Sequence, residues 1–269
     1  MDRPFTLAEA RALGISRTRV RGALEHGEIR RLARGLFVSN AADSADVVRS
    51  TCAVAEGRLA TSYIGAAKLH GLLVPPEPHR SMITPMRLGR IPKGHLYRSG
   101  KVMLAGAAWT AVNLARFQSL PAALVALDSA LRAGVRRNEL QDCEGHMRGW
   151  PGIAGVSAAI AAADELAESA LESLARGHCM LAGLPPPTLQ AEVVANRHRY
   201  RLDLAWPARK VVLEVDGLVK YTEQQVMLAE KRRHNDLQAA GYTVLRCGYI
   251  NLYPKADVLM HQLRRLVTD

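Results

Sequence analysis

Three acidic residues, Asp203, Glu214 and Asp216, lie in or next to two short stretches that are otherwise mostly apolar. Residues 201–205 alternate polar and apolar side chains, and residues 211–215 form a β-branched run, so we predict a β-hairpin. Side chains alternate between the two faces of a strand, so Glu214 and Asp216 should share a face that Asp203 reaches from the partner strand.

Carboxylates that converge without a nearby cation repel one another, and burial raises their pKa values. A divalent metal ion relieves both effects, and Mg²⁺ is commonly held by one or two carboxylates and a substrate phosphate. One interpretation is therefore that Mg²⁺ or Mn²⁺ binds among Asp203, Glu214 and Asp216. The alternative is a solvated sheet face with pairing to Arg201 or Lys210, and the spacing alone does not separate the two.

The N-terminal residues predict a helix-turn-helix. Thr6 and Glu9 have the spacing of a capping box before a first short helix, and Ser16 can cap a second helix that Gly27 ends. The residues expected to face the core are Leu13, Ile15, Val20 and Leu24. The residues expected to face outward near the start of the second helix are Arg17, Arg19 and Arg21. That end of the second helix enters the major groove in helix-turn-helix proteins.

Residues 29–32 and 36–38 predict a β-hairpin wing after the two helices. Its arginines, Arg30, Arg31 and Arg34, are expected to contact DNA phosphates. A small helical cap with a solvated arginine face is the alternative.

This region resembles the winged helix-turn-helix of AbiEi-type antitoxins over about forty residues. The matching residues are Leu13-Gly14-Ile15-Ser16, Arg30-Arg31-Leu32 and Arg34-Gly35-Leu36-Phe37-Val38. The resemblance implies DNA binding by these residues, followed in such proteins by an α/β domain.

The length of 269 residues suits two or three domains, and we predict an α/β multidomain protein. The expected domains are a winged helix-turn-helix over residues 1–40, a middle α/β domain over 41–150 and a C-terminal domain over 151–269. Residues 1–100 hold 16 basic and 8 acidic side chains, so the positive charge is concentrated where DNA binding is expected.

No stretch is long and apolar enough to span a membrane, and no signal peptide is visible, so DNA is a better partner than a membrane and we expect a cytoplasmic protein. The cysteines, Cys52, Cys143, Cys179 and Cys247, are scattered as expected of reduced thiols. Cys143 and His146 have half of a zinc spacing without a second pair. The histidines His70, His79 and His95 show no ligand spacing and are expected to be ordinary core or surface residues.

The C-terminal third predicts the order helix, strand, strand, helix, strand, helix. The expected ranges are 164–182, 201–205, 211–215, 223–240, 242–247 and 255–267. This order resembles the domain-of-unknown-function (559) family, which is similar to very short patch repair endonucleases and belongs to the PD-(D/E)XK nuclease class. The matching pieces are Ser169-Ala-Leu-Glu172, Ala182-Gly-Leu-Pro185, Gln190, Leu202-Asp203-Leu204-Ala205, Leu213-Glu-Val-Asp-Gly217, Lys220-Tyr221-Thr222, Glu230-Lys231-Arg232-Arg233 and Ala240-Gly-Tyr-Thr-Val-Leu-Arg246.

The resemblance implies a restriction-endonuclease-like fold and Mg²⁺-dependent hydrolysis of DNA phosphodiesters. It assigns Asp203 and Glu214 as metal ligands and Glu172 as the helix acid. Asp216 stands where the nuclease class has a lysine. Either Asp216 is a further metal ligand, or another cation, Lys220 or Lys231, supplies the positive charge.

The functional alternative is a DNA-binding regulator or antitoxin whose nuclease fold is inactive. An RNA-processing enzyme is a third, weaker interpretation. The sequence leaves a homodimer open beside a monomer.

Overall fold

The computed structural model describes residues 4–33, 35–41, 59–74, 86–99, 102–216, 224–253 and 256–268. The chain forms two compact units. The first comprises Met1–Phe117 and Val135–Ser157, and the second comprises Gln118–Gly134 and Ala158–Asp269. The two units therefore interleave along the sequence.

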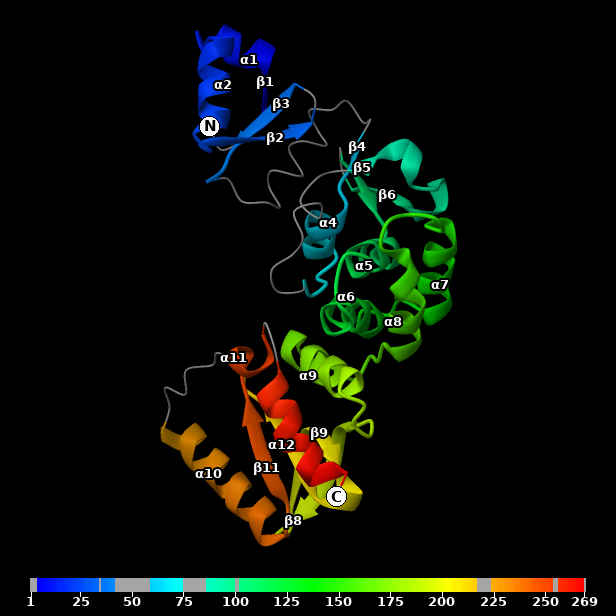
Figure 1. Cartoon of the computed structure of the whole chain (residues 1–269), viewed down its shortest axis with the longest axis vertical. Coiled ribbons are helices and arrows are strands. Elements are labelled where there is room, and N and C mark those ends of the chain that lie inside the picture. Colours follow the sequence, from blue (N-terminus) through cyan, green and yellow to red (C-terminus); the bar gives the residue numbers. More distant parts are fainter. Residues whose placement is uncertain are drawn as a thin grey trace. The chain divides into compact units, whose positions relative to one another are not determined.

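The N-terminal part of the first unit folds as a small helix pair with a three-stranded sheet (Figure 1). Its elements are β1 (Phe5–Thr6), α1 (Leu7–Ala12), α2 (Arg17–Glu25), β2 (Ile29–Ala33) and β3 (Leu36–Ser39), and the strand order is β1-β3-β2. The predicted capping box is confirmed, because Thr6 accepts from the Glu9 N–H and the Glu9 carboxylate accepts from the Thr6 N–H.

A compact apolar core joins these helices to the sheet. Phe5, Ala10, Val20 and Phe37 are buried together, with Ile15 and Leu24 packed against them. The prediction was wrong for Leu13, whose side chain is 66% exposed. Leu13 caps the end of α1 and precedes Gly14, which has a positive φ, so the chain turns away before Leu13 can reach the core.

The rest of the first unit consists of short strands and helices. They are β4 (Leu59–Ala60), α4 (Tyr63–Leu69), β5 (Met86–Arg87), β6 (Leu96–Ser99), β7 (Val102–Ala105), α5 (Ala107–Ala115), α7 (Arg137–His146) and α8 (Val156–Ala162), which continues into the second unit. A buried cation, Arg116, holds the helices together by donating to Asn113 Oδ1 at 2.6 Å, Pro151 O at 2.6 Å and the Tyr63 hydroxyl at 3.2 Å. These partners replace the water that burial removes from the guanidinium group.

The second unit is built on a four-stranded sheet of order β11-β10-β9-β8. Its elements are α6 (Leu120–Arg132), α9 (Ala170–Leu181), β8 (Thr188–Ala195), β9 (His198–Trp206), β10 (Val211–Val215), α10 (Gln224–Ala239), β11 (Thr243–Cys247), α11 (Tyr249–Leu252) and α12 (Asp257–Val267). Strands β8, β9 and β10 are antiparallel, and β11 is parallel to β10 because α10 crosses between them.

The predicted hairpin is present as β9 and β10, but the predicted order lacked one strand. Strand β8 lies at the edge of the sheet and pairs with β9 over most of its length. Its polar Gln190 and Glu192 weaken the apolar alternation by which a strand is recognised in a sequence, as is common at sheet edges.

Helix α9 begins six residues later than predicted, so Glu168 is not on it. The Ser169 hydroxyl accepts from the Glu172 N–H at 3.1 Å and fixes Ser169 as the N-cap. Two leucines within the predicted range, Leu166 before the helix and Leu181 at its end, are 50% and 62% exposed, so neither faces the core.

Helices α6 and α9 approach each other closely in the second unit. A Cβ added at Gly177 would lie 2.4 Å from the Cα atom of Pro121, so only glycine fits there. The same pair of helices buries an ion pair, in which Arg176 Nη2 lies 2.8 Å from both carboxylate oxygens of Asp128. Burial raises the pKa of Asp128, and Arg176 opposes that rise.

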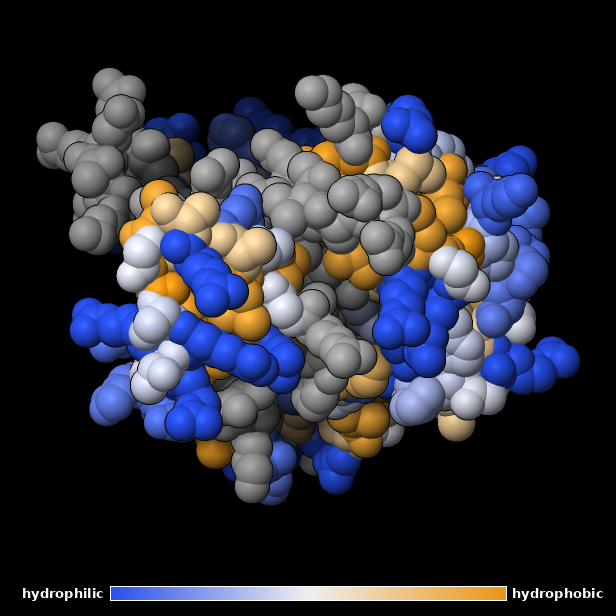
Figure 2. Space-filling model, turned by 90° about the horizontal axis from the view of Figure 1, so that it is seen from above, coloured by the Kyte–Doolittle hydropathy of each residue, from blue (hydrophilic) through white to orange (hydrophobic). Residues whose placement is uncertain are grey.

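Hydrophilic residues occupy much of the described surface shown in Figure 2, and apolar residues lie between them in several patches. Within the residues that the structure describes, no helix has the length and apolar character needed to cross a membrane.

We expect Gly177→Ala to lower the free energy of unfolding by about 1–3 kcal/mol, because the added methyl group must push the α6 backbone away. The measurement is chemical denaturation of the full chain. Gly145→Ala on α7 is the matched control, since a Cβ there would lie within 4 Å of no atom beyond its own helical turn, and it should leave stability unchanged or slightly higher. Equal destabilisation by both variants would contradict the close approach.

Candidate functional site

The N-terminal end of α2 presents a basic surface. The Ser16 hydroxyl accepts from the Arg19 N–H at 3.1 Å, which fixes the start of the helix. Arg17, Arg19 and Arg21 are all exposed, as predicted. Only a weak exposed contact of 3.9 Å joins Arg21 to Glu25, so water and solute ions reach the guanidinium groups.

The two wing arginines that the structure describes differ in exposure. Arg31 is exposed, whereas Arg30 is half-buried, and neighbouring residues of a strand point to opposite faces. Leu32, Leu36 and Val38 form a small buried cluster in the wing. Arg34 lies outside the described residues. Arg31 is therefore the better placed of the two for a phosphate contact.

Asp203 and Glu214 lie on neighbouring antiparallel strands of the second unit. Leu204 pairs with Leu213 in the register, so the two acids flank the same pair of residues. Asp203 Oδ2 accepts from the Val215 N–H at 2.8 Å, and Glu214 is only 7% exposed. The carboxylate of Asp203 is thus tied to the strand that carries Glu214.

Glu172 lies in the first turn of α9 and is also buried. Its Oε2 atom accepts from the Glu168 N–H and from Gln190 Nε2, both at 2.9 Å. Glu172 therefore helps to close the start of its own helix, a structural role that the sequence did not indicate.

The acids interact electrostatically with one another. Burial raises the pKa values of Glu172 and Asp203, and it raises the pKa of Glu214 to about 7. The negative charge of Asp203 adds to the rise for both Glu172 and Glu214, and Asp216 adds to that of Asp203. A cation in this place would be favourable.

An arginine already supplies part of that positive charge. Arg233 of α10 donates to Glu214 Oε1 at 2.6 Å, so the expectation of acids without a neighbouring base was wrong. Arg246 of β11 lies 3.8 Å from Asp216 and also pairs with Glu230. Neither pairing follows from residue spacing alone. Arg233 lies one helical turn before Leu237, which the fold buries, and the parallel pairing of β10 with β11 brings Arg246 opposite Glu214.

Lys231, one of the two lysines expected to replace the motif lysine, is exposed on α10. Lys220 lies outside the described residues. The alternative pairing with Arg201 or Lys210 is not observed either, because Arg201 pairs with Glu168 and Lys210 donates to Ala240 O.

The donor set at this place is made of carboxylate oxygens, which are the ligands that Mg²⁺ prefers. No three of these acids bring carboxylate oxygens within 4.8 Å of one another. An ion here would therefore be held by two of them together with water or phosphate oxygens, which is the usual coordination of Mg²⁺ in proteins.

Comparison with known proteins supports the N-terminal interpretation. Residues 2–40 match the family described as "Transcriptional regulator, AbiEi antitoxin", which confirms the resemblance in this region. An uncharacterised protein of Mycobacterium tuberculosis, MT2308 in strain CDC 1551 and Rv2248 in strain H37Rv, is 36% identical over 149 residues. That alignment covers 55% of this chain and 55% of the relative, so the chain spans about half the length of the curated relatives it matches. No solved structure matches the chain.

The pKa of Glu214 predicts a pH dependence of stability. The pKa of Glu214 is about 7 in the folded chain, whereas its ordinary value is 4.5. Between pH 4.5 and pH 7 the Glu214 carboxyl therefore keeps its proton in the folded state and has lost it in the unfolded state. The free energy of unfolding should therefore fall as the pH rises from about 4.5 to 7. Glu214→Gln, which has no carboxyl group to titrate, should lack this decrease in the free energy of unfolding, which is on the order of 3 kcal/mol.

The measurement is urea unfolding of metal-free protein at pH 5 and pH 8. Glu192→Gln on β8, with a side chain 62% exposed, is the matched control and should behave as the wild type. A stability difference between Glu214→Gln and the wild type that is the same at both pH values would contradict the shifted pKa.

Proposed function

We propose that the protein is a DNA-binding transcriptional regulator or antitoxin that contacts duplex DNA through its N-terminal winged helix-turn-helix. The observation that carries the proposal is the exposed arginine surface at the start of α2, within the segment that matches the AbiEi transcriptional regulators.

The geometry suits major-groove binding. Arg17 begins α2 and Arg21 follows one turn later, so both lie on one side of the helix, near the end that approaches base edges in helix-turn-helix proteins. Arg19 lies on another side and is free to contact the backbone. The exposed Arg31 of the wing adds a phosphate contact outside the groove.

Binding of the full chain to fluorescent duplex DNA, measured by anisotropy over a range of salt concentrations, tests this proposal. Affinity should fall steeply with salt because each phosphate contact releases counterions. The double variant Arg17→Ala/Arg21→Ala should weaken binding roughly tenfold or more, and each arginine that contacts a phosphate should account for about one unit of the salt slope.

Arg136→Ala is the matched control, since the Arg136 side chain is 74% exposed at the start of α7 and far from α2 in sequence. It should bind DNA as the wild type does. Absence of binding at low salt, or equal binding by the double variant and the wild type, would exclude the winged helix as the DNA-binding element.

A second function, Mg²⁺- or Mn²⁺-dependent hydrolysis of DNA, is favoured by the carboxylates of the second unit. The order of one helix, three antiparallel strands, a crossover helix and a parallel strand is compatible with the nuclease class that the sequence resembles. Asp203 and Glu214 would hold the ion, and Asp216 would serve as a further ligand only if its carboxylate moved closer to theirs. Bound there, the ion would supply a water of lowered pKa and charge stabilisation at the phosphate.

The residues of the chain would have distinct parts in such a site. Asp203 is positioned by the Val215 N–H and Glu172 by Gln190, so both carboxylates have fixed orientations. Arg233 now pairs with Glu214. When a metal ion takes the place of Arg233 beside Glu214, the guanidinium group could bind the phosphate instead. Lys220 and Lys231 remain proposals for the same role.

If the site is functional, Mg²⁺ or Mn²⁺ at a hundredfold excess over its dissociation constant should stabilise the folded chain by about 2.7 kcal/mol. Asp203→Asn should abolish this stabilisation and any metal-dependent cleavage of plasmid DNA while leaving DNA binding by the winged helix unchanged. Asp257→Asn, at the start of α12, is the matched control. Equal metal stabilisation of Asp203→Asn and the wild type would remove Asp203 as a ligand.

A further inference from the structure

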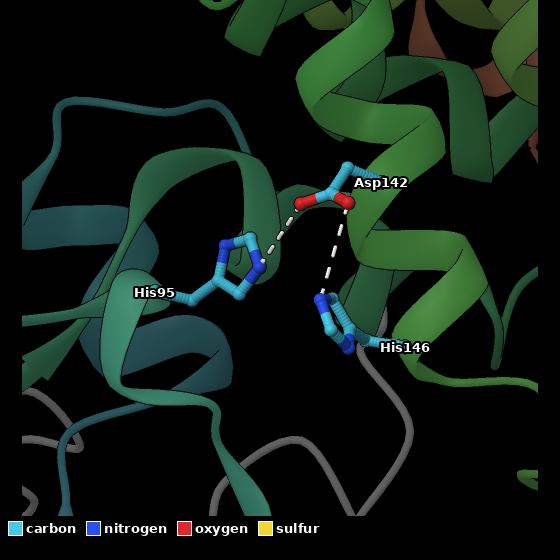
Figure 3. Close-up of side chains that lie close together, drawn as sticks. All are labelled: His95, Asp142 and His146. Atoms are coloured by element: carbon cyan, nitrogen blue, oxygen red, sulfur yellow. Dashed lines mark ion pairs between the residues drawn. The ribbon is translucent and has the colours of Figure 1, made fainter.

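Two histidines and one aspartate of the first unit point toward one another (Figure 3). Asp142 and His146 lie one turn apart on α7, and His95 ends the short 3-10 helix Lys93–His95. Oxygen atoms of Asp142 lie 3.3 Å from His95 Nε2 and 3.9 Å from His146 Nε2. The three ligand atoms all lie within 4.8 Å of one another, and no other group of three does so in the part of the chain that the structure describes.

These separations suit a tetrahedral metal ion. Zinc binds histidine nitrogen and carboxylate oxygen at about 2.0–2.2 Å, so two ligand atoms of a tetrahedral site lie about 3.3 Å apart. His95 Nε2 and Asp142 Oδ2 already have this spacing, whereas His146 Nε2 lies 3.9 Å from the other carboxylate oxygen, so His146 must move closer for all three side chains to bind one ion.

The surrounding side chains orient His95. Its ring lies against the buried Trp109 ring, with 5.2 Å between centroids, and Trp109 in turn contacts Trp150 at 5.8 Å. Cys143 Sγ lies 3.5 Å from His95 Nδ1. When Nδ1–H donates to this sulfur, the lone pair is on Nε2, the atom that faces Asp142, as in metal sites where the second ring nitrogen donates to a neighbour.

We propose that His95, Asp142 and His146 bind a divalent transition-metal ion, with Zn²⁺ as the favoured ion. Two imidazole nitrogens and one carboxylate oxygen suit Zn²⁺ or Fe²⁺ better than Mg²⁺, which prefers oxygen ligands. The site is separate from the carboxylates of the second unit, so it does not depend on the proposed function.

Three protein ligands leave one coordination position of a tetrahedral ion for a water molecule or another small ligand. A cavity of about 590 Å³ reaches this place, and its lining includes His70, His95, Tyr97, Trp109, Glu139 and Asp142. Solvent therefore has access to the ion. The site also links the loop before β6 to α7, so a bound ion should stabilise the first unit.

The test is zinc binding to the full chain after removal of metal with a chelator, measured by titration calorimetry and by the visible absorption of Co²⁺ used as a probe. The wild type should bind one Zn²⁺ with histidine ligation, and its melting temperature should rise by roughly 5–10 °C at a hundredfold excess over the dissociation constant. His146→Ala and Asp142→Asn should each weaken zinc binding by roughly a hundredfold or more and abolish the tetrahedral Co²⁺ spectrum.

Both substituted side chains are largely exposed, at 46% for His146 and 62% for Asp142, so the variants should fold, and circular dichroism checks this. His261→Ala, an exposed histidine of α12, is the matched control, and Asp203→Asn separates this site from the carboxylates of the second unit. Both should retain zinc binding. No zinc binding by the wild type at millimolar concentration, or unchanged binding by His146→Ala and Asp142→Asn, would show a hydrogen-bonded cluster without a metal.

Discussion

The removal of water from charged side chains is the constraint that distinguishes the two candidate sites. The chain carries a formal net charge of +11, and the arginines at the start of α2 remain in water, where they can exchange counterions for DNA phosphates. Glu172 and Glu214 are instead buried and Asp203 is half-buried, and this loss of hydration raises the pKa values of all three. A charge that loses water needs a partner, and Arg233 provides one for Glu214.

The same constraint operates elsewhere in the described structure. Arg116 is buried with three oxygen acceptors, and Arg176 is buried against both oxygens of Asp128. Such pairs contribute little net stability, but removal of one partner leaves an uncompensated charge. They fix the helices of each unit. The pKa of Asp128 stays raised beside Arg176, as the pKa values of Asp203 and Glu214 do near Arg233. What distinguishes the acids of β9 and β10 is that neighbouring acids add to the rise, since Asp203 raises the pKa values of Glu214 and Glu172, and Asp216 raises that of Asp203.

Local patterns in the sequence were sufficient for much of the fold. The Thr6 capping box, the Ser16 cap and the β9–β10 hairpin depend on residues a few positions apart, and each is present. Strand β8 was not predicted because its polar residues, which are common in edge strands, obscure the alternation of apolar side chains. The start of α9 was predicted too early. Apolar residues at helical spacing continue before Ser169, but the helix begins only after Ser169, which caps it.

The spacing of residues in the sequence could not predict contacts between residues that are far apart in it. Arg233 meets Glu214 only because α10 crosses from β10 to β11, and His95 meets Asp142 and His146 only through the tertiary fold. His95 was expected to be an ordinary core or surface residue for that reason, whereas His146 was noted only for half of a zinc spacing with Cys143. Of the other two histidines in that prediction, His70 is half-buried with Nε2 2.7 Å from Ala105 O, and His79 lies outside the described residues.

The assignment of DNA binding to the winged helix is the central claim, and hydrogen–deuterium exchange of the full chain with and without duplex DNA tests it most directly. Amide protons of α2 and of the wing strands should exchange more slowly when DNA is bound, with the effect strongest around Arg17 to Arg21. Protection confined to the second unit, with none in residues 4–41, would contradict the account and move the DNA-binding surface to the carboxylate-bearing sheet.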